Sequence, residues 1–133
     1  MGPKVQKFEF YFPEVTALDL LKGILAFADR DKSYSCNPVK YNRFFQDAAK
    51  GYPELFMDIS VEEDNFLPYS EDIEKAYTAA MEFNILSRPN PDIYPCKIIA
   101  SPKRLKKTLE KFRPEDIKKF RELAERFESE LKE

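Results

Sequence analysis

The residue types that most often carry chemistry are scarce in this chain of 133 residues, which contains no histidine and two cysteines. Without histidine the chain lacks Ser-His and Cys-His nucleophile pairs, histidine metal ligands and histidine pH switches. Cys36 and Cys96 are too far apart in sequence to suggest a zinc site or a disulfide scaffold. We expect two buried thiols in a reducing cytoplasm, with a single disulfide between them as the alternative.

Motifs for nucleotide or acyl chemistry are also missing. The chain has no P-loop, no Gly-x-Gly-x-x-Gly turn, no Gly-x-Ser-x-Gly elbow and no metal-binding cluster. Carboxylates are plentiful, but Glu62, Glu63 and Asp64 fall in a polar loop, and nothing indicates a buried acid–base pair. The sequence therefore predicts a protein that is not an enzyme and that uses no metal or cofactor.

A run of cations between residues 103 and 113 is the clearest candidate for a binding function. Six cations stand there against Glu110, whereas residues 54–86 hold nine carboxylates against Lys75, so the net charge of −2 conceals a dipolar molecule. Such a run is often only a solvated surface. The functional alternative is contact with nucleic-acid phosphates or with an acidic partner, including the acidic face of a second copy. The six candidates are Lys103, Arg104, Lys106, Lys107, Lys111 and Arg113.

The elements that would position these residues can be predicted from caps and turn formers. Thr16, Asn37 and Ser70 are each placed to cap a helix, and the third helix reaches to about Leu86. The stretch FMDISV, residues 56–61, could form a strand. Turn residues in SRPNPDIYP, followed by the apolar run CKIIA, predict a two-stranded wing.

Together these signals predict one α+β domain over residues 1–133, mainly helical and winged-helix-like, with a small β wing and a long C-terminal helix. Residues 1–15 would form an N-terminal strand or arm, and residues 16–101 would form the core and the wing. Residues 102–133 would form the basic segment and the C-terminal helix. Hydrophobic residues make up 43% of the chain, which is enough for a packed core.

The outer face of the third predicted helix indicates whether a winged-helix domain of this sequence would read DNA. Its Ile/Ala/Tyr side should turn inward, which leaves an acidic outer face. A helix that reads DNA normally presents Arg, Lys, Asn or Gln to base edges, and carboxylates are repelled by the phosphates. We therefore expect this helix not to read DNA. The residues predicted to face solvent are Glu71, Glu74, Lys75, Thr78 and Glu82.

The last predicted helix carries apolar residues in steps of three and four. Two heptads are too few for a stable isolated coiled coil. The stripe could pack onto the body of the protein, or it could form the seam of a homodimer. The residues of the candidate dimer seam are Ile117, Phe120, Leu123, Ala124, Phe127 and Leu131.

The stretch FLPYSEDIEKAYTAAMEFNILSRPNP resembles the region around the Gly-Pro-Tyr-Ser helix of Panacea-type domains, with Leu67 in place of the glycine. The family includes phage-associated proteins and antitoxins of toxin–antitoxin systems. The motif covers residues 66–87, and the order of elements agrees in outline over residues 18 to 130. The resemblance implies a non-catalytic module that binds another protein, with DNA contact secondary.

Targeting signals are absent from the sequence as given. No apolar run approaches the roughly 20 residues that a membrane span needs. The start MGPKVQKFEF has no signal-peptide core, so we predict a cytoplasmic protein. Abundant charge with three glycines is typical of a thermophilic source.

Three functional hypotheses follow from these features. The first is a non-enzymatic interaction or regulatory protein that acts through protein–protein contacts, with a homodimer or another protein as the partner. The second is a winged-helix transcriptional regulator that contacts DNA through the wing and residues 103–113. The third is a small-ligand sensor built from Phe44, Phe45 and Tyr77, although such aromatic stripes are more often plain core.

Overall fold

The computed structural model describes residues 15–59 and 69–133. Its elements follow in the order α2 (Ala17–Leu25), β1 (Ser33–Ser35), α3 (Pro38–Gly51), α4 (Glu71–Glu82), β2 (Leu86–Ser87), β3 (Pro95–Ile98), α5 (Pro102–Thr108), the 3-10 turn η1 (Leu109–Lys111) and α6 (Pro114–Leu131). The predicted α+β class is therefore confirmed, with helices predominating in the described ranges. Of the arm predicted at residues 1–15, residues 1–14 lie outside the described residues, as does the acidic loop at residues 62–64.

Side-chain caps begin three helices at the predicted residues. The Thr16 hydroxyl accepts a hydrogen bond from the Asp19 N–H at 3.1 Å, and the Asp19 carboxylate accepts one from the Thr16 N–H. Asn37 caps α3 and Ser70 caps α4 in the same way, with side-chain oxygens that accept from Val39 and Ile73. Each cap satisfies a backbone donor that the first helical turn leaves unpaired, so the helices begin where the sequence predicts.

The three strands form an antiparallel sheet in the order β1-β3-β2. Tyr34 of β1 lies opposite Cys96 of β3. The outer edge of β1 is closed by the end of the chain, because Lys132 bridges to Tyr34 and the Glu133 N–H donates to the Ser33 carbonyl at 2.9 Å. Pairing this edge removes a row of backbone groups that would otherwise invite another strand.

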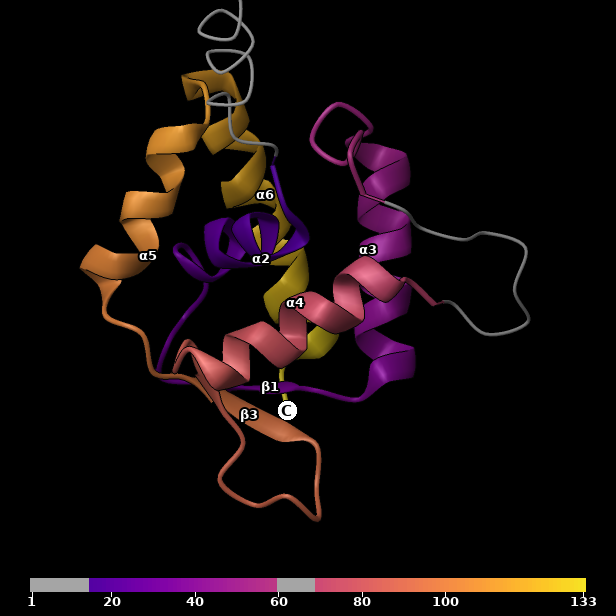
Figure 1. Ribbon diagram of the computed structural model, residues 1–133, viewed down its shortest axis with the longest axis vertical. Coiled ribbons are helices and arrows are strands. Elements are labelled where there is room, and N and C mark those ends of the chain that lie inside the picture. The colour runs from indigo at the N-terminus through magenta and orange to yellow at the C-terminus, as the bar shows by residue number, and fades with distance from the viewer. Residues whose placement is uncertain (1–14, 60–68) are drawn as a thin grey trace, which may run out of the picture.

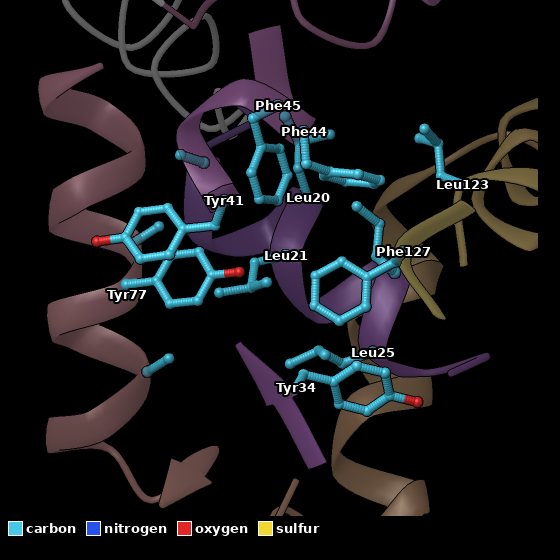
Figure 2. Packing of buried hydrophobic residues seen from close by; sticks show 14 of the residues in the cluster. Leu20, Leu21, Leu25, Tyr34, Tyr41, Phe44, Phe45, Tyr77, Leu123 and Phe127 are labelled. Carbon is cyan, nitrogen blue, oxygen red and sulfur yellow. The ribbon is translucent and has the colours of Figure 1, made fainter. Parts of the chain in front are cut away.

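Helix α2 lies at the centre of the helical layer. It packs against α4, α5 and α6, and Figure 1 shows it nearly end-on, above α4, which crosses in front of α6. Its residues Leu20, Leu21 and Ile24 are fully buried. Figure 2 shows Leu20 and Leu21 between the aromatic side chains of α3 and α4 on one side and Phe127 of α6 on the other. A helix that is apolar nearly all round is buried in this way.

The segment FMDISV does not pair as a strand in its described part. Residues 53–59 form consecutive turns, with backbone hydrogen bonds from Leu55 to Tyr52 and from Ile59 to Phe56. Leu55 and Phe56 are buried and anchor these turns. The prediction of a strand at residues 56–59 is therefore wrong, because local turns satisfy the backbone groups that a strand would need to pair.

Candidate functional site

The predicted cationic run lies on α5 and η1 at the outer edge of the helical layer, with its last residue, Arg113, at the N-cap of α6 (Figure 1). Leu105 and Thr108 of α5 point inward and are buried. The Ser101 hydroxyl caps α5 by accepting from the Arg104 N–H at 3.2 Å. Because the inward positions are occupied by these two residues, all six predicted cations are exposed.

Two of the six predicted cations form ion pairs with carboxylates of the protein itself. The Lys111 ammonium lies 3.1 Å from both carboxylate oxygens of Asp19, so it ties η1 to the first turn of α2. The Arg113 guanidinium pairs with Glu115 at 3.1 Å and with Asp116 at 3.5 Å. The other four form no ion pair with any residue in the described ranges. They are Lys103, Arg104, Lys106 and Lys107.

A further cation, Lys22 of α2, joins this cluster. Its pKa is lowered by partial burial, and the positive charges of Arg104 and Lys111 lower it further while Asp19 opposes them. We call Lys22, Lys103, Arg104, Lys106 and Lys107 the α5 surface. An open hollow of about 610 Å³ is lined by Pro102, by the three lysines of α5 and by Glu110, but not by Lys22 or Arg104. The sequence could not reveal Lys22, because only the packing of α5 on α2 brings it near Arg104.

The outer face of α4 is acidic, as predicted, with one exception. Glu71, Lys75, Thr78 and Glu82 are exposed, and Lys75 pairs with Glu71 at 3.2 Å. Glu74 was predicted to face solvent, but it is half-buried. Its role is structural, and the prediction of its exposure is wrong.

The Glu74 carboxylate joins α4 to α3. One oxygen accepts from the Tyr41 hydroxyl at 2.8 Å, and the other accepts from the Asn42 side-chain amide at 2.6 Å. The Asn42 carbonyl oxygen in turn accepts from the Ser70 N–H at 3.0 Å, at the cap of α4. A helical periodicity shows which way Glu74 points but not what lies beside it, so the sequence could not reveal these partners.

The aromatic residues of the proposed ligand sensor are packed against one another. Phe44, Phe45 and Tyr77 are buried, and their rings meet edge to face at centroid distances of 5.0 and 6.3 Å. Tyr77 also stacks on Tyr41 with centroids 3.8 Å apart (Figure 2). The Tyr77 hydroxyl is buried without a hydrogen-bond partner among the described residues. These three rings are therefore part of the hydrophobic core.

The candidate dimer seam on α6 lies inside the protein. The stripe packs onto α2, α3 and β1, and the Phe127 ring contacts Tyr34 and Phe44 at centroid distances of 5.0 and 5.4 Å. The prediction of a seam on this face is wrong, because a heptad-like pattern does not say what the apolar stripe packs against. A second copy would have to bind elsewhere. Five seam residues are buried and Ile117 is half-buried: Ile117, Phe120, Leu123, Ala124, Phe127 and Leu131.

The two cysteines are buried and unbonded. The Cys36 N–H donates to the Tyr94 carbonyl at 2.9 Å, which places Cys36 just beyond β1 and beside β3. A hydrogen bond with Cys36 raises the pKa of the Cys96 thiol, and burial raises it further. The prediction of buried thiols is confirmed, and the alternative disulfide is not formed. In residues 15–59 and 69–133, no three ligating side chains gather as a metal ion would require.

A second exposed feature, not anticipated from the sequence, lies where α4 meets the β2–β3 hairpin. Four large apolar side chains are exposed on these elements: Phe83 at the C-cap of α4 (56%), Ile93 (49%) and Tyr94 (44%) in the β2–β3 loop, and Ile99 (46%) just after β3. Together with the half-buried Met81 we call them the α4–wing surface. Ile98 is the last residue of β3 and Ile99 follows it directly, and successive side chains of an extended segment point to opposite faces, so this signal was present in the sequence.

The α4–wing surface is hollowed and its loop is internally braced. Adjoining hollows of about 200 and 360 Å³ share Met81 and Arg88; Tyr94 lines the first and Ile99 the second. The Arg88 guanidinium donates to the carbonyls of Ile93 and of Pro91, at 2.8 Å to the latter, and lies over the Tyr94 ring at 5.1 Å. The loop is therefore fixed by contacts of its own, and Arg88 is already engaged.

Comparison of the chain with protein-family models, with curated proteins and with solved structures finds no match. Within the described residues, no helix combines the length and the apolar character that crossing a bilayer requires. What the protein does must therefore be inferred from the α5 surface and the α4–wing surface.

Proposed function

We propose that the protein is a non-enzymatic, winged-helix-like interaction module that binds another protein through the α4–wing surface. The observation that carries the proposal is that the exposed side chains of Tyr94 and Ile99 line two adjoining hollows that share Met81. Phe83 and Ile93 add exposed apolar area at the end of α4 and in the β2–β3 loop. Exposed apolar patches with aromatic side chains are typical of surfaces that bind proteins. The cytoplasm is the proposed compartment, since both thiols are free.

The winged-helix architecture is supported by the order of the elements. One helix, one strand, two helices and two strands follow in that order, and the sheet order β1-β3-β2 places the last strand between the other two. In this scheme α4 takes the place of the recognition helix and the β2–β3 hairpin is the wing. The connection between α3 and α4, from Tyr52 to Ser70, is much longer than the roughly four residues of a helix-turn-helix.

The chemistry of α4 favours a protein partner over DNA on this side. Its exposed positions include Glu71 and Glu82, and its Lys75 is paired with Glu71. A polyanion would meet repulsion there without gaining base contacts. A braced wing with an exposed tyrosine suits a protein interface, because less conformational entropy is lost on binding. The resemblance to Panacea-type domains supports the same kind of function.

The test compares partner capture by three forms of the protein. Tyr94→Asp combined with Ile99→Asp places charge on the α4–wing surface, whereas Met57→Asp places a charge on a residue that is 77% exposed elsewhere. We expect wild type and Met57→Asp to retain the same protein from host extract, and the double variant to lose it. Equal retention by all three would refute the proposal. Light scattering at micromolar concentration would show whether the partner is a second copy, which would give a dimer.

A winged-helix regulator that contacts DNA is the second candidate, and one observation favours it. Lys103, Arg104, Lys106 and Lys107 extend from α5 without ion pairs in the described part of the chain. Unpaired cations on one exposed helix are an electrostatic footprint of polyanion binding. Arg88 of the wing is engaged within the loop, so it is not available for such contact.

A further inference from the structure

We infer that the α5 surface binds the sugar–phosphate backbone of duplex DNA without reading its base sequence. The inference rests on the second candidate function and narrows it: Lys22 of α2 is added to the contact and the wing is left out of it. It does not depend on the α4–wing surface.

The positive charge of the α5 surface is concentrated by the fold. Four cations lie within the seven residues of α5, and Lys22 is brought beside Arg104 by the packing of α5 on α2. Partial burial is the main cause that lowers the pKa of Lys22; the Asp19 carboxylate opposes it, and the positive charges of Arg104 and Lys111 lower the pKa further. An anion placed beside Arg104 and Lys22 would be attracted by both cations, in addition to the three lysines of α5.

The composition of the α5 surface fits a nucleic acid better than a protein. Pro102 is the one apolar residue among the exposed positions from Ser101 to Lys107. Protein interfaces are depleted of lysine at their centre and are anchored by aromatic and aliphatic side chains. Interfaces with nucleic acid are more polar and far more positively charged. The α4–wing surface thus has the composition of an interface with protein, whereas the α5 surface has the composition of an interface with nucleic acid.

The side-chain types favour backbone contact in a duplex. Adenine is read mainly by Asn and Gln, and α5 has neither. Its lysines and Arg104 can contact any phosphate of the backbone as well as guanine. Single strands are held by aromatic side chains on which bases stack. No aromatic residue lies in α5, and the half-buried Phe112 packs its ring against Phe120 at a centroid distance of 4.8 Å. Lysines act as point charges toward phosphates, so the expected binding is independent of sequence.

Fluorescence anisotropy with a short labelled duplex tests the inference on the full chain. We expect binding at low salt whose affinity falls on a log–log plot with a slope of about −3, corresponding to three or four neutralised phosphates. Lys106→Glu combined with Lys107→Glu should weaken binding about tenfold or more and make the slope shallower by roughly 2. Two duplexes of unrelated sequence should give the same affinity within about twofold.

A matched control separates local contact from net charge. Lys50→Glu combined with Lys118→Glu makes the same change in charge at exposed positions on α3 and α6, and it should change affinity by less than about threefold. Lys106→Gln with Lys107→Gln should give about half the free-energy effect of the reversal. These neutral replacements keep the test decisive if the reversed variant fails to fold.

The contrary results are equally definite. Absence of duplex binding at low salt, equal losses in the α5 and control variants, or strong preference for one sequence would each overturn the inference. Tighter binding of poly-glutamate than of duplex would show that the α5 surface serves an acidic protein instead. Ile99→Asp should leave duplex affinity unchanged, so failure of the α4–wing proposal and failure of this inference can be told apart.

Discussion

Glu74 was expected to be a surface residue, but in the structure it links two helices. It lies on the same helix as Glu71, and the two carboxylates are equally plausible surface residues in the sequence. In the structure Glu74 accepts hydrogen bonds from Tyr41 and Asn42, whereas Glu71 meets Lys75 in solvent. Hydrogen bonds to a charged group in a half-buried setting contribute far more than an exposed ion pair does.

Replacing the two glutamates should therefore have very different effects. We expect Glu74→Ala to lower the free energy of unfolding by about 2–3 kcal/mol, because Tyr41 and Asn42 lose their acceptor. Glu71→Ala is the control and should change it by less than about 0.5 kcal/mol. Urea unfolding followed by circular dichroism measures both, and equal effects would contradict the role assigned to Glu74.

The stacked pair Tyr41 and Tyr77 offers a second comparison at the level of single atoms. The Tyr77 hydroxyl has no hydrogen-bond partner in the described structure, so Tyr77→Phe should leave stability unchanged or raise it by up to about 1 kcal/mol. Tyr41→Phe removes a donor to Glu74 and should cost about 1–2 kcal/mol. The stacked rings stay in place in both variants. A larger loss for Tyr77→Phe than for Tyr41→Phe in urea unfolding would contradict this assignment.

At the scale of elements, the approach of α2 to α6 depends on a glycine. A Cβ on Gly23 would lie 2.7 to 2.9 Å from three atoms of the Phe120 ring, and that ring is completely buried. Alanine normally stabilises a helix interior relative to glycine by about 1 kcal/mol. Here the ring cannot move without disturbing its neighbours, so steric overlap outweighs the gain in helix propensity.

We accordingly expect Gly23→Ala to lower the melting temperature and to cost about 1–3 kcal/mol of stability. Gly51 at the end of α3 is the matched control, because the nearest atom to its added Cβ is the Arg126 guanidinium nitrogen at 3.9 Å. Gly51→Ala should be neutral or slightly stabilising. Thermal unfolding of the two variants checks this, and a stabilised Gly23→Ala would show that α2 and α6 are less closely packed.

The elements also show what the sequence could and could not predict. The caps at Thr16, Asn37 and Ser70 are local, and the helices start at the predicted residues. The partner of the α6 stripe is not local, and the same apolar spacing suits a dimer seam or the protein's own core. The nearness of Lys22 to Arg104 likewise depends on how α5 packs on α2. Sequence reasoning thus predicted the charged segment of the candidate site but not its full set of cations.

At the scale of the whole molecule, buried tyrosines link stability to pH. Burial is the main cause that raises the pKa of Tyr34, Tyr41 and Tyr77 above the ordinary value. In the unfolded chain these hydroxyls ionise near pH 10. Their contribution to stability is therefore complete below about pH 10 and is lost as the pH rises above that value, because the unfolded chain then releases protons that the folded protein retains.

We expect the free energy of unfolding to decrease above about pH 10 by up to roughly 4 kcal/mol per pH unit, about 1.4 kcal/mol for each of the three tyrosines. Urea unfolding at a series of alkaline pH values measures the slope. The part of the tyrosinate absorbance that comes from these three residues, assigned with single Tyr→Phe variants, should rise together with loss of helix. Ionisation of these tyrosines well before the helix is lost would show that they are accessible in the folded protein.

The two unbonded thiols give the sheet a natural reporter of its own opening. Cys96 is almost completely shielded on the central strand β3, and both burial and its contact with Cys36 keep it in the unreactive, protonated form. An alkylating reagent can therefore modify it only during excursions in which β3 separates from its neighbours. The rate of this labelling measures how often β3 separates from the neighbouring strands, and no label has to be engineered into the chain.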